Sequence, residues 1–146
     1  MKRIVSITVA LLGMSLMSGA IAEDKRQLLN FPPMMRDHML QNMRDHLMAL
    51  QEIQAFMAVS EYEKAADVAE TRLGMSSLDN HGASHMAQMM PKPMQDIGTA
   101  MHKAASRFAV TIQEISVDDS DLRPALKGLA EITQQCVACH AAYRVH

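Results

Sequence analysis

The residues with the most distinctive chemistry lie near the C-terminus, in the run Cys136-Val137-Ala138-Cys139-His140. Two thiols three residues apart lie about one turn from each other on a helix, and the next histidine projects beside them. The spacing C-x-x-C-H is typical of covalent haem attachment. Each thiol would form a thioether with one vinyl-derived carbon of the porphyrin, and His140 would be the proximal ligand of the iron.

Other readings of the two cysteines explain less of the sequence. A structural zinc site usually needs two further Cys or His ligands at motif spacing. A thioredoxin-like redox pair expects a βαβ context, which the sequence does not show. A plain disulfide is chemically compatible with an oxidising compartment. We therefore expect one covalent haem c, held by Cys136 and Cys139.

The N-terminus reads as an export signal. Lys2 and Arg3 precede an apolar run over residues 4–18, and Ala20-Ile21-Ala22 is an A-x-A cleavage site. We expect residues 1–22 to be removed and residues 23–146 to form one domain in the periplasm. Thioether formation takes place in that compartment. An uncleaved anchor is the alternative, although the apolar run is short for a membrane span. The remaining chain would carry a formal charge of about −4 and no basic cluster, which argues against nucleic acid as a partner.

Hydrophobic residues make up 49% of the chain and methionines number 15, whereas strand-like alternation is not evident. Helical periodicity predicts four helical segments, over residues 32–59, 60–73, 94–117 and 122–143. Ser60 and Glu63 read as a capping box and Gly74 as a helix stop. Residues 75–93 read as a connector. The sequence predicts an all-α, up-down-up-down antiparallel four-helix bundle.

Each long segment has an apolar stripe at helical spacing. In the first segment the stripe comprises Met39, Met43, His46, Leu50, Ile53 and Met57. In the last it comprises Leu122, Leu126, Leu129, Ile132 and Cys136. In an up-down-up-down bundle the last helix ends where the first begins. We therefore expect the haem motif to lie close to the first turns of the first helix, where Met39 and Met43 share the inward stripe.

The C-terminal pattern Cys136-x-x-Cys139-His140-x-x-Tyr143-Arg144 resembles the ending of the class II c-type cytochromes. The resemblance covers essentially the whole chain after the signal. It is strongest to the low-spin c-556 type, in which a first-helix methionine is the second axial ligand. Met39, Asn42 and Arg44 match a Met-x-x-Asn-x-Arg run around that ligand. The resemblance thus implies Met39 as the distal iron ligand, with Met43 as the runner-up.

Three functions follow from these features. With His140 and Met39 on the iron, we expect a single-electron carrier with transient redox partners, not an enzyme. With Leu40 at the distal face, the iron would be five-coordinate and would bind gases such as nitric oxide and carbon monoxide, as in the cytochromes c prime. A copper-handling role is the third alternative, because His81 to Met94 is rich in His and Met. The resemblance also raises a homodimer through the first two helices, which the exposed residues leave open.

Overall fold

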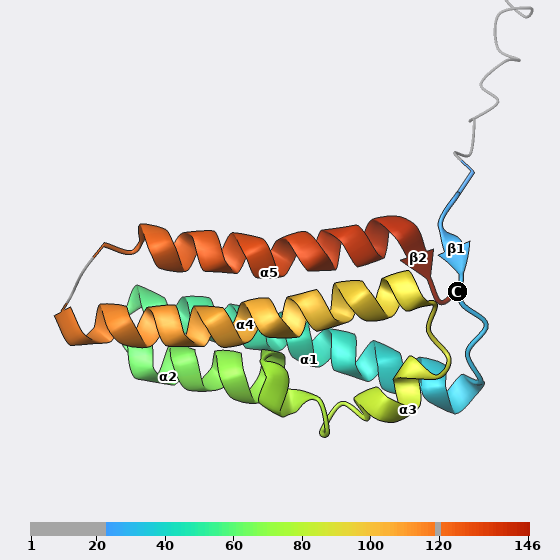
Figure 1. The fold of residues 1–146 in the computed structure, drawn as a ribbon, viewed down its shortest axis with the longest axis horizontal. Coiled ribbons are helices and arrows are strands. Elements are labelled where there is room, and N and C mark those ends of the chain that lie inside the picture. The colour runs from blue at the N-terminus through green and yellow to red at the C-terminus, as the bar shows by residue number, and fades with distance from the viewer. Residues whose placement is uncertain (1–22, 119–120) are drawn as a thin grey trace, which may run out of the picture.

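The computed structural model describes residues 23–118 and 121–146 (Figure 1), so the expected export signal, residues 1–22, lies outside the described residues. Five α-helices and two short helical turns account for most of the described chain. Its strands are one pair of two residues each, so the all-α class predicted from the sequence is confirmed. None of the helices in these ranges combines the length and the apolar character needed to cross a membrane.

The first long helix, α1, spans Pro33–Ala58. Pro33 suits the first turn, because its ring fixes φ and its missing N–H would have no partner there. The inward stripe follows the predicted spacing of three and four residues. Met43 is half-buried. The buried residues of α1 are Met39, His46, Ala49, Leu50, Ile53 and Met57.

The turn after α1 differs from the prediction. The next helix, α2, spans Tyr62–Val68 and has no side-chain cap, so the predicted capping box of Ser60 and Glu63 is wrong. Ser60 instead has a φ of 58°, in the left-handed region, and its amide donates to the Met57 carbonyl oxygen at 3.2 Å. An N-cap residue needs an extended backbone. Ser60 therefore reverses the chain after α1 rather than capping α2.

A π-helical turn, η1, continues α2 over Ala69–Leu73 and ends at Gly74, where the sequence predicted a stop. Gly74 is extended rather than left-handed, so its small size is what the position requires. A Cβ there would collide with the carboxylate of Glu70. That carboxylate accepts a hydrogen bond from the Ser76 amide at 3.2 Å and fastens the turn.

The segment expected to be a plain connector contains two short helices. A 3-10 turn, η2, spans Met75–Ser77, and α3 spans Ala83–Ala87. Gly82, at a φ of 60°, lies directly before α3. Glycine adopts this left-handed conformation without steric cost, which explains why the helix starts there. Residues 75–91 are called the connector below.

Two long helices complete the fold, α4 at Lys92–Asp118 and α5 at Arg123–Ala142. They run side by side over most of their length (Figure 1). Phe108 of α4 is buried against Gly128 of α5, where an added Cβ would lie 3.0 Å from Phe108 Cδ2. The missing side chain at Gly128 thus allows the two helices to approach closely.

The inward face of α5 matches the prediction only in part. Ile132 is buried as expected, together with Ala125, but Leu122 is exposed and Leu126 is 58% exposed. The other two predicted positions are half-buried: Leu129 and Cys136. Among the described residues, α5 packs mainly on α4 and makes few close backbone contacts with α1. A helix covered on one side buries a narrower stripe, so Leu126 stays in solvent.

The buried side chains form two clusters. The larger one runs along α1, α2, α4 and α5 and includes the fully buried Ile53, Phe108, Ile112 and Ile132. The smaller one, called the methionine cluster below, lies where α1 and α4 begin and α5 ends. Its buried members are Leu29, Met39, Met86 and Met94; its half-buried members are Phe31, Met35, Met43, Met90, Cys139, Tyr143 and Val145.

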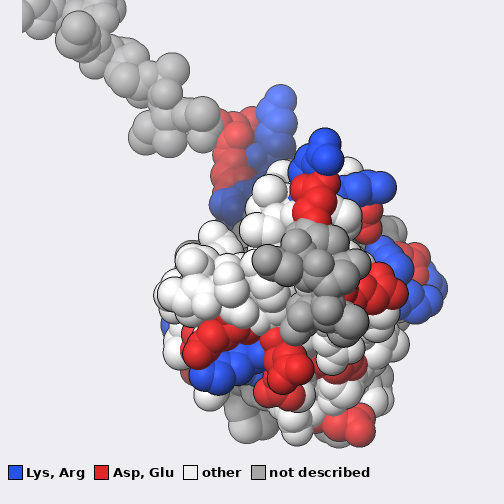
Figure 2. Space-filling view, turned by 90° about the vertical axis from the view of Figure 1, so that its left-hand side faces the viewer, with Lys and Arg blue, Asp and Glu red and all other residues white. Residues whose placement is uncertain are grey.

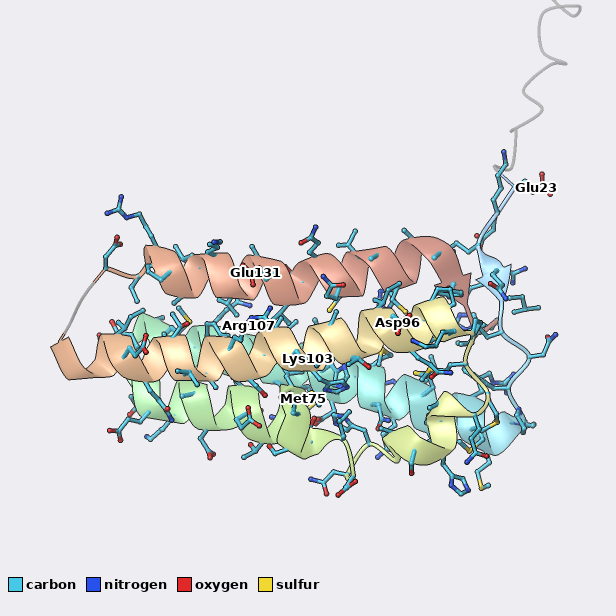
Figure 3. All side chains as sticks on the ribbon, in the orientation of Figure 1. Glu23, Met75, Asp96, Lys103, Arg107 and Glu131 are labelled. Atoms are coloured by element: carbon cyan, nitrogen blue, oxygen red, sulfur yellow. The ribbon has the colours of Figure 1, made fainter. Side chains whose placement is uncertain are left out.

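Charged side chains are interspersed on the end of the molecule opposite the methionine cluster, and neither sign dominates that face (Figure 2). Ion pairs on the surface include Lys64 with Glu61 at 2.9 Å. Between α4 and α5, Arg107 and Glu131 approach within 3.3 Å (Figure 3). Exposed pairs of this kind contribute little to stability, so the helices are held by their apolar contacts.

A short clasp joins the two ends of the described chain. Strand β1, Gln27–Leu28, pairs in parallel with strand β2, Tyr143–Arg144, directly after α5. The Leu29 amide adds a hydrogen bond to the Arg144 carbonyl oxygen at 2.8 Å. No strand was predicted here, because two residues are too few to show alternation. The clasp fixes the first described residues over the end of α5.

Candidate functional site

A cavity of about 250 Å³ lies at the end of the molecule where α1 begins and α5 ends. Its apolar wall comes from α1 and from the first turn of α4. Its other wall comes from the last turn of α5 and the C-terminal residues. The lining residues are Arg26, Leu29, Met39, Leu40, Met43, Met94, Cys139, His140, Tyr143, Arg144, Val145 and His146.

The two cysteines lie on the last turns of α5 and are not joined by a disulfide. Cys136 packs against the larger core cluster, and its Sγ lies 3.6 Å from the Ile132 carbonyl oxygen. Cys139 belongs to the methionine cluster and lines the cavity. At about 100° per residue, Cys136, Cys139 and His140 fall within an arc of about 100° on the helix surface. The three side chains therefore project from one side of α5.

Burial raises the pKa of both thiols, and the proximity of Cys136 raises that of Cys139 further. Reactive thiol pairs and zinc-binding cysteines are instead found where positive charge or a metal lowers the thiol pKa. The two side chains are thus held as neutral thiols in a largely apolar setting. This environment disfavours a thiolate-based redox role.

His140 is exposed at the end of α5, and its side chain lines the cavity. Its imidazole contributes a nitrogen donor beside the thiol of Cys139. The opposite wall offers only thioether and aliphatic groups: Met39 is buried, while Leu40 and Met43 are half-buried. All three sequence candidates for the distal position thus line the same cavity as His140. Met34, in contrast, is 78% exposed.

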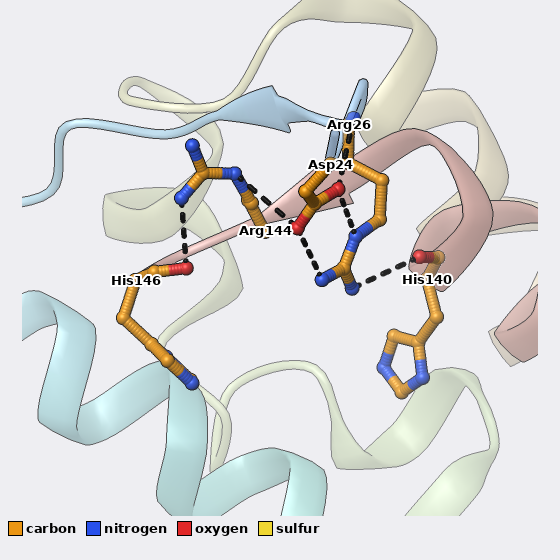
Figure 4. A network of polar contacts seen from close by, with 5 residues as sticks. All are labelled: Asp24, Arg26, His140, Arg144 and His146. Atoms are coloured by element: carbon orange, nitrogen blue, oxygen red, sulfur yellow. Dashed lines mark hydrogen bonds and ion pairs between the residues drawn. The ribbon is translucent and has the colours of Figure 1, made fainter. Parts of the chain in front are cut away.

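A polar rim closes one side of the cavity (Figure 4). Asp24 accepts hydrogen bonds from Arg26 Nε at 2.9 Å and Arg26 Nη2 at 2.7 Å, and these hold the pKa of Asp24 well below its usual value. Arg26 Nη1 also donates to the His140 carbonyl oxygen at 3.4 Å. Arg144 Nε lies 3.6 Å from Asp24, and this buried nitrogen has no hydrogen-bond partner among the described residues.

Sequence reasoning did not find the role of Arg26 in this rim. Its only sequence signal was its position shortly after the expected cleavage site. The β1–β2 clasp carries it across the chain to the end of α5, and no local pattern encodes that contact. Arg144 was part of the C-terminal pattern, but its orientation toward the cavity depends on the same clasp.

The histidines and methionines of the connector are divided between different environments. His81 is half-buried and turned toward His46, whereas His85 is exposed on α3. Met86 is buried in the methionine cluster. Across the described ranges, no group of three or more His, Cys, Asp or Glu residues is arranged to hold a metal ion. The two histidines on which the copper-handling alternative depends, His81 and His85, thus lie in different environments.

No protein-family model matches this chain, and neither a curated protein nor a solved structure is significantly similar to it. The geometry of the cavity, the chemistry of its lining and the C-x-x-C-H spacing are therefore the grounds for assigning a function.

Proposed function

We propose that this protein is a periplasmic c-type cytochrome that carries single electrons. One observation carries the proposal: the thiols of Cys136 and Cys139 and the imidazole of His140 share one side of the last turns of α5, beside a cavity walled by α1 methionines. Thiols suit thioether formation, and imidazole is a common proximal ligand of haem iron. A haem c bound here would supply reversible one-electron chemistry.

The residues present fit that group. The wall that faces His140 is apolar, as a porphyrin face requires, and both cysteines are free. The rim adds Arg144, whose buried Nε has no hydrogen-bond partner among the described atoms and lies 3.6 Å from Asp24. Its guanidinium carries the positive charge with which a carboxylate of a haem edge would pair. Two neutral thiols beside a buried guanidinium nitrogen that makes no hydrogen bond in the described part of the chain are unexplained by a purely structural role.

We assign the distal position to Met39 on its burial in the cavity wall and on the resemblance to the c-556 type. A thioether ligand favours the reduced iron and raises its potential. Both axial positions would then be taken by the chain, so substrates would have no access to the iron. The same resemblance supports an up-down-up-down four-helix bundle built from α1, the α2–η1 segment, α4 and α5.

One specific observation keeps a second function in view. Leu40 also lines the cavity, one residue from Met39 along α1. If Leu40 covers the distal face, His140 is the only axial ligand and the protein binds small gases instead of relaying electrons. A copper-handling role has less support, because His81 and His85 do not face one site.

The partners of an electron carrier would dock weakly and briefly at the cavity end through a small interface. Export through residues 1–22 would place the chain in the compartment where thioether attachment occurs. Both points are proposals that rest on the sequence pattern and on the position of the cavity at one end of the molecule.

The test is to express the full chain with its own N-terminus in a bacterium that attaches haem to exported proteins. Denaturing mass spectrometry should show loss of the signal and addition of one haem, and the variant with both Cys136→Ser and Cys139→Ser should lack the haem mass. Spectra of the oxidised and reduced protein should be low-spin and insensitive to carbon monoxide. An unmodified wild-type mass would overturn the cytochrome proposal.

Two methionine variants separate the axial assignments. Met39→Ala should become high-spin and bind carbon monoxide, because it removes the proposed thioether ligand. Met43→Ala is the matched control and should stay low-spin. It removes the same side-chain atoms from the same cavity wall but leaves Met39 in place. A high-spin wild-type protein that binds carbon monoxide at once would favour the gas-binding function instead.

A further inference from the structure

Three histidines from distant parts of the chain meet in the interior, beyond the methionine cluster. His46 comes from α1, His81 from the connector and His102 from α4. The ring centroids of His46 and His81 lie 4.7 Å apart. The ring centroid of His102 lies 5.9 Å from that of His46 and 5.7 Å from that of His81. His46 and His102 are buried, and His81 is half-buried. We call these residues the histidine cluster.

The hydrogen bonds of the cluster join the rings to the backbone around them and bring two ring nitrogens face to face. His102 Nδ1 donates to the Leu73 carbonyl oxygen at 2.8 Å, and the buried Ser77 hydroxyl donates to the Gly74 carbonyl oxygen at 2.7 Å. His46 Nε2 faces His81 Nδ1 at 3.5 Å. A protonated imidazole donates from both nitrogens. Protonation of both rings would therefore direct two N–H groups at each other.

The charges around the cluster oppose protonation on balance. Burial and the neighbouring His81 and His102 lower the pKa of His46 to about 4. Burial also lowers the pKa of the other two histidines. Asp45 acts in the opposite direction on His46 and His81, but its carboxylate is already paired with Arg72 at 2.5 Å.

The remaining charged and titratable groups that the structure describes near the cluster include no unpaired carboxylate that could neutralise a protonated ring. Arg72 also pairs with Glu52 at 2.7 Å, and the guanidinium itself disfavours a charged His46. His38 of α1 disfavours a charged His81. A proton on His46 is thus opposed by two neighbouring rings and a guanidinium, and among the side chains only the paired Asp45 favours it. At His102 the backbone carbonyls of Leu73 and Gly74 favour the charged ring, but burial outweighs them.

The cluster also fastens the connector to α1. The His81 carbonyl oxygen accepts hydrogen bonds from His38 Nε2 at 2.9 Å and from Asn42 Nδ2 at 3.1 Å. The chain then turns at Gly82 into α3, and Met86 of α3 packs in the methionine cluster. The position of Met86 beside Met39 therefore depends on how His81 is held.

We propose that the histidine cluster is an acid-operated latch: with neutral rings it holds the connector against α1 and α4, and on protonation it releases the connector and exposes the methionine cluster. The latch rests on the contacts of the histidine cluster and on the two hydrogen bonds that the His81 carbonyl oxygen accepts from α1. It holds whether or not the protein carries haem, because none of these side chains lines the cavity. Its effect is to make access to the cavity wall depend on pH.

Hydrogen–deuterium exchange of the exported full-length protein tests the latch, with rates divided by the intrinsic rate at each pH. Between pH 7.5 and pH 5, amide protection over residues 75–90 should fall by about tenfold or more, as expected for local opening. Protection over residues 123–135 in α5 should change far less. Equal loss in both segments, or no loss over residues 75–90, would overturn the proposal.

Variants assign the effect to the cluster. His46→Gln keeps a neutral polar side chain of similar size but cannot take up a proton, so the fall in protection should shrink several-fold. His102→Gln serves the same purpose if circular dichroism shows that His46→Gln is unfolded. His85→Gln is the matched control, because His85 is exposed on the same connector. Full wild-type pH dependence in both cluster variants would rule out the latch.

Discussion

Acid should weaken this fold through His46 by an amount that can be worked out. The unfolded chain protonates this residue near pH 6.5, whereas the folded protein does not until about pH 4. Between these values the unfolded state binds more protons, so stability is complete above pH 6.5 and is lost as the pH falls toward 4. The shifted pKa of His46 therefore lowers the free energy of unfolding by a negligible amount at pH 7 and by about 2 kcal/mol at pH 5.

The perturbation is His46→Gln, which removes this titration. The free energy of unfolding, measured by urea denaturation at pH 7 and pH 5, should fall with acid in both proteins, because carboxylates and other histidines also titrate. The fall should be smaller in His46→Gln by about 2 kcal/mol, because this variant lacks the contribution of His46 at pH 5. His85→Gln should behave like the wild type. Equal falls in wild type and His46→Gln would show that the cluster does not keep His46 neutral.

Two further pairs of variants test the packing. Ile53→Ala should lower the free energy of unfolding by about 3–4 kcal/mol, because it empties a fully buried site. Leu47→Ala changes a side chain that is 70% exposed, so it should change the free energy of unfolding by no more than about 0.5 kcal/mol. Gly98→Ala in α4 should raise it by about 0.5–1 kcal/mol, since the added methyl meets no atom within 4 Å. Gly128→Ala should show no such gain, because its Cβ would press on Phe108. Urea denaturation measures all four, and equal effects within either pair would contradict these contacts.

Local patterns predicted the parts of this fold that depend on neighbouring residues. The stripe of α1 follows from helical spacing, and the structure buries Ile53 and Met57 as that spacing requires. The expectation that Cys139 and His140 lie near the start of the first helix also holds, because both line one cavity with Met39. The expected helix lengths and an assumed alternation of chain direction were sufficient for that inference.

The errors arise where distant residues decide the outcome. Ser60 has the side chain of a cap, but the reversal after α1 forces it into a left-handed conformation. Leu126 has the spacing of a core residue, but the sparse contact between α5 and α1 leaves it exposed. His102 was not singled out, because a lone histidine in α4 gives no sign that two others will meet it. Tertiary contacts override local preference at each of these positions.

The clasp between β1 and β2 has a consequence for the order of events during biogenesis. It joins residue 27 to residue 143, so it cannot form until the last turn of α5 has left the ribosome. Contacts between such distant positions are slow to close, whereas helix hairpins form from neighbouring segments. We therefore expect the cavity end to remain open while the rest of the chain condenses. If the chain is the c-type cytochrome proposed above, that interval would leave the thiols of Cys136 and Cys139 accessible for haem attachment before the clasp closes.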